Sequence, residues 1–395
     1  MRLTRALGSF FTCAALASSV AAQQKVALSK PLAETEESFT RIGAIRELPN
    51  GKVLVVDAQD RVLQLVDLAA GTMTKVGREG SGPGEYSLPG ALLALPDGST
   101  LLMDMLNRRL LTISPDGKPG AFVELPRPPQ SGGGGPMMTI GGMDSRGTDS
   151  KGWIYMQGVS FPRPGETASP DSAPILKWDR VSPKFDTVGF VKVPANQVVR
   201  GGGGGGRVAV SFGGQKVFAP AETWAVSADG RIARITPNPY RVVWMDGPGK
   251  QTAGPVQQYT PIKVTEAEKE RWREARRRTP GMMISMGPSG RTVSQAPVGQ
   301  GPDPEFEETM PPFGAGGPGS GSSVFVSPDG EVWVLRTRPA SDKIPSYDVF
   351  DRTGALSRKV TLNPNSRVVG FGKGTVYVAR SDEDDLQYLQ RYARP

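Results

Sequence analysis

The sequence predicts an all-β protein, a single six-bladed β-propeller, and three observations support that prediction. First, a polar residue followed by glycine recurs six times, each time between two short apolar runs, as a hairpin turn requires. Second, a further apolar run follows each hairpin, so every unit has the strand content of a propeller blade. Third, the last unit reaches Pro395 without a fourth strand, whereas strand-like residues 25–32 precede the first unit.

The six turns place the blades along the chain. They are Asn50-Gly51, Asp97-Gly98, Lys151-Gly152, Asp229-Gly230, Asp329-Gly330 and Lys373-Gly374. The strands expected directly after them are 52–56, 100–103, 153–156, 231–235, 331–335 and 375–378. Valine, leucine, isoleucine and tryptophan dominate these runs, which is typical of buried sheet. We expect residues 25–32 to complete the last blade, because closing the ring removes a free sheet edge.

One stretch, residues 76–118, contains a nearly complete repeat. It has a glycine-rich approach, two apolar runs around a turn, and the corner Asp104-x-x-Asn107-x-Arg109. This stretch resembles the NHL-type propeller repeat, and the chain resembles six-bladed propellers of the NHL-repeat, TolB-like type. The resemblance implies that the corner residues, including Asp57 in the first unit, mainly tie blades together: the aspartate caps a turn and the arginine reaches a neighbouring blade.

The same resemblance implies a metal site as an alternative. Six-bladed lactonases and gluconolactonases hold one calcium ion in the channel through Glu, Asn and Asp, which are hard oxygen ligands. The matching residue types here are Asp57, Asp104, Asn107 and Glu308. No spacing joins them into a signature, so we expect a protein without a cofactor and keep calcium as the alternative.

Composition restricts the chemistry further. Histidine is absent, and the one cysteine, Cys13, lies near the N-terminus. The absence of histidine excludes Ser-His-Asp and Cys-His catalysis and histidine-bound zinc. Any enzymatic reaction would have to use carboxylates, Lys, Arg, Tyr, Ser, Thr or an oxygen-ligated metal.

Residues 1–22 have the pattern of a secretory signal. Arg2 and Arg5 precede a short apolar run, which ends in the small residues Val20-Ala21-Ala22. The propeller would then span residues 23–395 and lie in a bacterial periplasm or outside the cell. Acylation of Cys13, which would make the protein a lipoprotein, is the alternative. Loss of two arginines takes the formal charge from +8 to +6 (8 − 2), an excess too mild to imply nucleic acid.

Four long insertions are expected to gather on one face, because each falls between strands 2 and 3 of a blade or between two blades. They are residues 127–136, 158–174, 194–215 and 253–321. The last one contains a predicted helix, 266–278, which begins with a capping box formed by Thr265 and Glu268. A seventh blade hidden in the same insertion is the alternative.

Charged residues of that face are the candidate ligand-binding groups. They are Glu308, Arg336, Arg338, Arg207, Asp57 and Asp104, with Arg200 beside them. The arginines could bind a carboxylated or phosphorylated ligand. Glu308 could stand over the channel, or the apolar residues around it could simply anchor the insertion. We expect a monomeric, non-catalytic module that binds a protein or a small anionic ligand. A calcium-dependent lactonase and an envelope scaffold are the alternatives.

Overall fold

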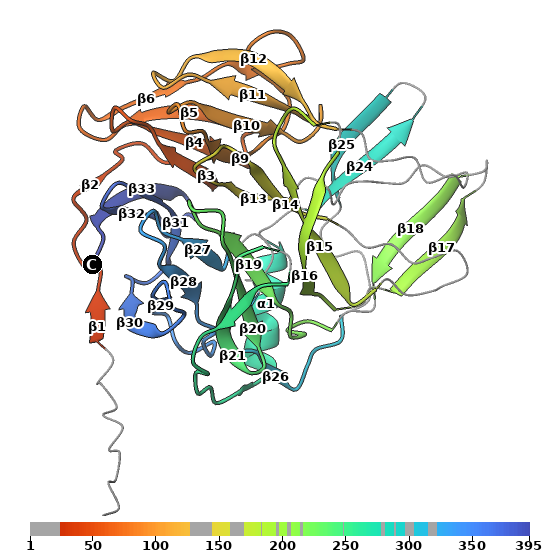
Figure 1. The fold of residues 1–395 in the computed structure, drawn as a ribbon, viewed down its shortest axis with the longest axis vertical. Helices are drawn as coiled ribbons and strands as arrows, with labels where there is room; N and C mark the ends of the chain where they lie inside the picture. Colours follow the sequence, from red (N-terminus) through yellow and green to blue (C-terminus); the bar gives the residue numbers. More distant parts are fainter. Residues whose placement is uncertain are drawn as a thin grey trace, which may run out of the picture.

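Six β-sheets are arranged around a central axis, and the predicted six-bladed propeller is confirmed (Figure 1). The computed structural model describes residues 24–126, 144–158, 170–182, 184–194, 197–203, 207–213, 216–247, 249–277, 281–287, 290–296, 304–314 and 322–395. The expected signal, residues 1–22, lies outside this range. No helix among the described residues is long and apolar enough to cross a membrane.

The blades follow one another along the chain, each with its first strand innermost. Blade 1 contains β3 (Ile42–Glu47), β4 (Val53–Asp57), β5 (Val62–Asp67) and β6 (Thr72–Lys75). Blade 2 contains β9 (Pro89–Ala94), β10 (Thr100–Asp104), β11 (Arg109–Ile113) and β12 (Pro119–Glu124). Blade 3 contains β13 (Asp144–Thr148), β14 (Ile154–Gln157), β15 (Ser172–Trp178) and β16 (Asp186–Lys192). Blade 4 contains β19 (Thr223–Val226), β20 (Ile232–Pro237), β21 (Tyr240–Met245) and β22 (Gln251–Ala253). Blade 5 contains β27 (Val324–Val326), β28 (Val332–Leu335), β29 (Ser346–Phe350) and β30 (Leu356–Thr361). Blade 6 contains β31 (Ser366–Gly372), β32 (Thr375–Ser381) and β33 (Gln387–Ala393).

Apolar side chains between neighbouring blades form the core. Trp224, Trp244 and Trp333 are fully buried there, on strands of blades 4 and 5. Strands β4 and β10 are buried along their whole length, because a blade that packs between two others has no solvent face. This explains why the sequence shows continuous apolar runs in these strands rather than a strict alternation.

The N-terminal segment supplies the last strand of blade 6, as predicted, but the expected residues 25–32 are wrong, because residues 33–34 form that strand. The short strand β2 (Ala33–Glu34) pairs with β33 and supplies the fourth strand of blade 6. Residues 24–27, which form β1 (Gln24–Ala27), instead pair in parallel with β30 and add a fifth strand to blade 5. The segment therefore joins the last two blades, because one short connection between β1 and β2 carries it from one sheet edge to the next.

The two ends of the blades define two faces. The turn face carries the turns that join strands 1 and 2 and strands 3 and 4 of each blade. The loop face carries the loops between strands 2 and 3 and the connections between blades. Strands β17 (Gln197–Gly203), β18 (Arg207–Gly213), β24 (Gly281–Gly287) and β25 (Gly290–Ala296) form two hairpins that project from one side of the propeller (Figure 1). Both belong to connections between blades, so the predicted gathering of long insertions on the loop face is confirmed for these two.

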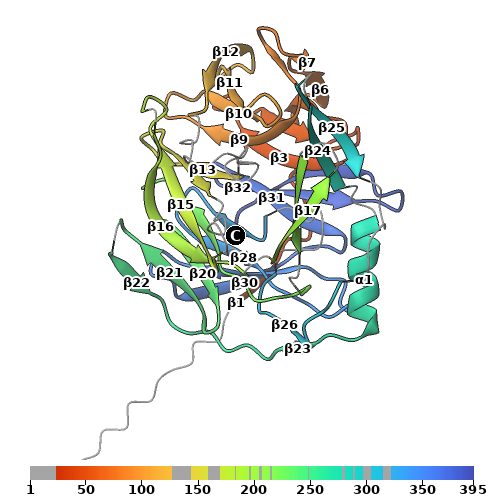
Figure 2. The same ribbon diagram turned by 90° about the vertical axis from the view of Figure 1, so that its right-hand side faces the viewer.

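The connection between blades 4 and 5 contains the predicted helix. Helix α1 (Glu266–Arg277) lies at the rim of the propeller in Figure 2. Strand β23 (Ile262–Lys263) precedes the helix in sequence, strand β26 (Thr309–Met310) follows it, and the two strands pair with each other. Within the described part of this connection, the strands form only two-stranded sheets, so the alternative of a seventh blade is wrong.

Candidate functional site

The two corner aspartates, Asp57 and Asp104, occupy equivalent places at the ends of β4 and β10. Asp57 accepts hydrogen bonds from the backbone N–H groups of Thr40 and Arg41, at 2.7 and 3.1 Å, and from its own following turn. Asp104 accepts from the N–H groups of Ser87 and Leu88, both at 3.2 Å. Each carboxylate therefore holds the connection that enters its own blade, as the resemblance implied for these corners.

Two further residues of the blade 2 corner, Asn107 and Arg109, also bind Asp104. The Asn107 side chain donates to Asp104 Oδ2 at 2.7 Å. Arg109 pairs with Asp104 at 3.3 Å, donates to the backbone oxygens of Ser81 and Glu85, and lies over the Phe122 ring at 3.6 Å. The guanidinium thus fastens the glycine-rich connection between blades 1 and 2 to blade 2. These groups have protein partners for their charges.

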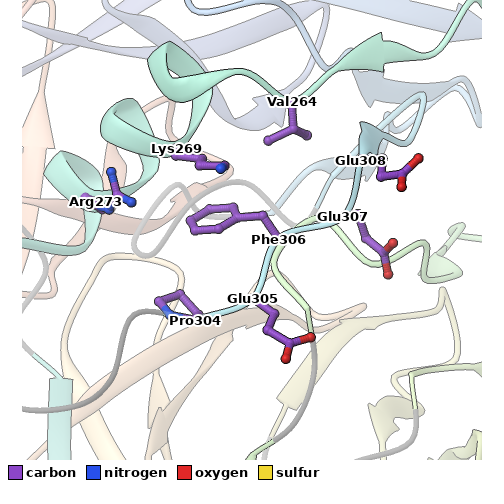
Figure 3. A pocket seen from close by; sticks show the side chains of 8 residues that line it. All are labelled: Val264, Lys269, Arg273, Pro304, Glu305, Phe306, Glu307 and Glu308. Atoms are coloured by element: carbon purple, nitrogen blue, oxygen red, sulfur yellow. The ribbon is translucent and has the colours of Figure 1, made fainter.

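Glu308 lies in a different part of the loop face. It is exposed, and its backbone oxygen accepts a hydrogen bond from Val264 N–H at 2.9 Å. Nearby Met310 and Phe313 are buried, so the apolar residues of this segment anchor the end of the insertion. An open groove of about 510 Å³ runs between this segment and α1 (Figure 3). Phe306 points across the groove toward the helix and meets Trp272 edge-on, with ring centroids 5.6 Å apart.

The calcium alternative requires several oxygen ligands at one point. Asp104 and Asn107 are in contact, but Asp57 caps the corner of another blade and Glu308 belongs to the connection between blades 4 and 5. Among the residues that the structure describes, no three His, Cys, Asp or Glu side chains form a group that could hold a metal ion.

Arg336 lies in a buried cluster between blades 4 and 5, which we call the closed cluster: Tyr240, Arg336 and Asp348. Arg336 Nη1 is 3.3 Å from Asp348 Oδ2, and the Tyr240 hydroxyl donates to the same oxygen at 2.9 Å. The guanidinium also lies 4.9 Å from the ring centroids of Tyr240 and Tyr259. Burial and the Asp348 charge raise the pKa of Tyr240 well above its usual value. Arg336 therefore has an ion-pair partner within its own chain.

Arg338, two residues further on, belongs to a second group of residues from blades 5 and 6, which are linked through their charges and which we call the open cluster: Arg338, Tyr347 and Arg367. The Tyr347 hydroxyl accepts a hydrogen bond from Val368 N–H at 2.9 Å, which places it beside Arg367. Burial raises the pKa of Tyr347 to about 12, although the Arg367 and Arg338 charges act in the opposite direction. Both guanidiniums therefore act on this hydroxyl through their charges.

The open cluster differs from the closed one in its partners. Arg338 Nε donates to the backbone oxygen of Asp342 at 3.1 Å. Arg367 donates to the backbone oxygen of Ile42 and to Gln387 Oε1. Within the described part of the chain, neither guanidinium forms an ion pair. Burial lowers the pKa of both arginines, and the charge of Asp342 acts in the opposite direction on Arg338.

Helix α1 adds a third guanidinium. Arg271 donates to the backbone oxygens of Arg338 and Pro339, at 2.8 and 3.0 Å. Burial, and then the Arg338 charge, lowers the pKa of Arg271. Glu268, the capping-box residue, also accepts from Ala340 N–H at 2.9 Å, so the helix is attached to the loop that carries Arg338.

Arg338 is one of the binding residues predicted from the sequence, whereas Arg271, Tyr347 and Arg367 are not. No motif marks these three residues, because blade packing brings them together from separate stretches of the chain. Arg200 and Arg207 belong to the β17–β18 hairpin, and their side chains lie outside what the structure describes.

Comparisons with known proteins matched solved structures at low sequence identity. No protein-family model and no curated protein matches the sequence. A regucalcin from Agrobacterium tumefaciens, described as a calcium-binding protein, is 12% identical with a TM-score of 0.41, over 94% of this chain and 97% of that one. A member of the DUF4221 family from Bacteroides vulgatus is 7% identical with a TM-score of 0.47, over 92% and 96% of the chains. A gluconolactonase from Xanthomonas campestris is 8% identical with a TM-score of 0.38, over 91% of each chain.

Proposed function

We propose that the protein is an exported, non-catalytic binding module that takes an anionic ligand on the loop face of its propeller. The observation that supports this proposal is the set of guanidiniums of Arg271, Arg338 and Arg367. They lie on one face, and among the described residues their hydrogen bonds go only to neutral oxygens. Half-buried cations without a carboxylate partner bind an anion with little further desolvation.

The carboxylates nearest to this set form no ion pair with it among the described residues, although the charge of Asp342 acts on Arg338 as well as on Arg271. Asp342 and Glu268 act on Arg271 through their charges, but neither forms an ion pair with it. Glu268 is already engaged with Ala340 and Thr265. The loop face therefore keeps an excess of positive charge at the junction of blades 5 and 6.

A small ligand fits this arrangement better than an acidic protein surface does. Arg367 is the second residue of an inner strand, and burial desolvates its guanidinium. A side chain on a folded partner reaches only groups near the surface, whereas a small anion can pass between loops.

Matched double variants test the proposal. The loop-face variant is Arg271→Gln with Arg338→Gln, and the turn-face variant is Lys118→Gln with Arg352→Gln, so that each loses two positive charges. Pyrophosphate or citrate at 100 times its dissociation constant should add about 2.7 kcal/mol to the stability of the native state. We expect these anions to raise the unfolding midpoint of the wild type and of the turn-face variant by about two degrees or more, against sodium chloride of equal ionic strength.

The loop-face variant should show no such rise. An equal rise in both variants would assign anion binding to some other part of the molecule and overturn the proposal. No rise in the wild type would do the same.

A further inference from the structure

The groove beside helix α1 borders a strand-like segment that has an open edge. Residues 305–307 run parallel to Val217 and form two hydrogen bonds with it. Val217 N–H donates to the Glu305 oxygen at 2.7 Å, and Glu307 N–H donates to the Val217 oxygen at 3.0 Å. The N–H and C=O groups of Phe306 therefore point to the opposite side, because the main-chain groups of a strand alternate in direction. Neither group forms a hydrogen bond within the described part of the chain.

The strand on that side stops before it reaches Phe306. Strand β23 pairs with β26, and Val264 N–H donates to the Glu308 oxygen at 2.9 Å. Beyond this point the chain turns into α1, and the groove of about 510 Å³ lies between the helix and residues 304–308 (Figure 3). An extended peptide in this groove continues the line of β23 and takes up the main-chain groups of Phe306.

Three carboxylates line the groove without partners. Glu305 and Glu308 are exposed, and Glu307 is half-buried. Among the residues that the structure describes, none of these side chains forms an ion pair or a hydrogen bond. They are therefore free to pair with positive charges of a partner.

The cations on the helix side of the groove are already paired within α1. Arg273 Nη1 lies 2.6 Å from a carboxylate oxygen of Glu266 and 3.3 Å from one of Glu270. Lys269 Nζ lies 3.7 Å from Glu266. The uncompensated charge of the groove is therefore negative, in a chain whose formal net charge is +8. A partner that complements this charge is basic.

Aromatic side chains give the groove an apolar side as well. Phe306 meets Trp272 edge-on at 5.6 Å and Phe218 at 6.0 Å between ring centroids, and all three are half-buried. Phe306 points toward α1, whereas Glu305 and Glu307 point to the other side (Figure 3). Side chains of an added strand alternate in the same way, so one set meets the aromatic rings and the other meets the carboxylates.

We propose that this groove binds an extended peptide in which basic and apolar residues alternate, as an added strand beside residues 305–307. The main chain of the peptide bonds to Phe306, its basic side chains pair with Glu305 and Glu307, and its apolar side chains pack on Phe306 and Trp272. The site is separate from the anion site of the proposed function, and neither depends on the other.

A synthetic heptapeptide of alternating lysine and valine is the probe. Fluorescence anisotropy should show that the protein binds it at least about ten-fold more tightly than the same peptide with glutamate in place of lysine, because like charges repel. Glu305→Gln with Glu307→Gln should weaken binding of the lysine–valine peptide about five-fold, the size expected for two exposed ion pairs. Glu36→Gln with Glu37→Gln, which removes two exposed carboxylates elsewhere, should leave binding unchanged.

Hydrogen exchange distinguishes an added strand from a contact made by charges alone. The bound lysine–valine peptide should slow the exchange of the Phe306 amide, because that N–H group gains an acceptor. Binding without any slowing at Phe306 would show that no strand is added there. Equal affinity for the lysine and glutamate peptides, or an equal loss in the two double variants, would exclude a basic partner in this groove. Failure of the wild type to bind the lysine–valine peptide would overturn the proposal outright.

Discussion

Blade 5 has a tyrosine–arginine cluster on each of its two sides, and the two clusters differ in one group. On the side of blade 4, Asp348 accepts from Tyr240 and pairs with Arg336. On the side of blade 6, Tyr347 accepts from Val368 N–H, the charges of Arg338 and Arg367 act on it, and no carboxylate pairs with either arginine within the described residues. Strand geometry explains the separation, because consecutive residues 347 and 348 of β29 point to opposite faces of the sheet.

This difference distinguishes a structural role from a binding role. A buried cation needs a counter-charge, since desolvation costs several kcal/mol per ion. The closed cluster supplies that counter-charge from its own chain and so completes a contact between blades. The open cluster has no ion pair among the described residues, and in the proposed function its counter-charge comes from the ligand. From residue type alone, Arg336 and Arg338 are equally good candidates for binding an anion.

The largest expected effect comes from opening the closed cluster. Arg336→Gln leaves Asp348 buried with only the Tyr240 hydroxyl as a partner, so the free energy of unfolding should fall by about 3 kcal/mol or more. Urea denaturation followed by tryptophan fluorescence measures this change. A loss below about 1 kcal/mol would show that the pair contributes little and that the two clusters are more alike than their contacts indicate.

A smaller effect is expected when the tyrosines are compared. Tyr240→Phe removes a hydrogen bond to a buried carboxylate and should cost about 1.5–3 kcal/mol of unfolding free energy. Tyr347→Phe removes only the acceptor of one backbone N–H group and should cost about 1 kcal/mol. The same denaturation experiment ranks the two variants. The reverse order would mean that the Tyr347 hydroxyl has a stronger structural partner than Val368.

Much of the fold could be predicted because its signals are local. The dipeptide turns Asp229-Gly230 and Asp329-Gly330 predict a strand directly after each of them. The observed strands β20 and β28 begin and end within two residues of the predicted bounds. Helix α1 follows its capping box, with Glu268 accepting from Thr265 N–H at 3.0 Å. The register of the N-terminal segment was missed, because pairing across the ring depends on which sheet edges are open. Nothing within residues 24–34 specifies those edges.

The candidate site was predictable only in part, for the same reason. Asp57 and Asp104 repeat a corner motif, so their structural role followed from the resemblance. Arg338 was predicted as a binding residue because it lies in a loop of the loop face. Tyr347 and Arg367 are 20 residues apart in sequence and belong to different blades. Only packing brings them together, and a single sequence does not report packing between blades.

The smallest expected effect has the opposite sign from the first and sharpens the comparison most. Arg338→Gln removes one of several mutually repelling cations, so at low ionic strength the free energy of unfolding should stay equal or rise by up to about 0.5 kcal/mol. Arg352→Gln on the turn face is the matched control, since it breaks a surface pair of 3.0 Å with Asp229 and should lower that free energy by a similar amount. Both differences should shrink at about 0.5 M sodium chloride, because added salt shortens the range of the interaction to a few ångström. A loss above about 1 kcal/mol in Arg338→Gln would place Arg338 with Arg336 as a structural residue, and the open cluster would then lack the free cation that its proposed ligand requires.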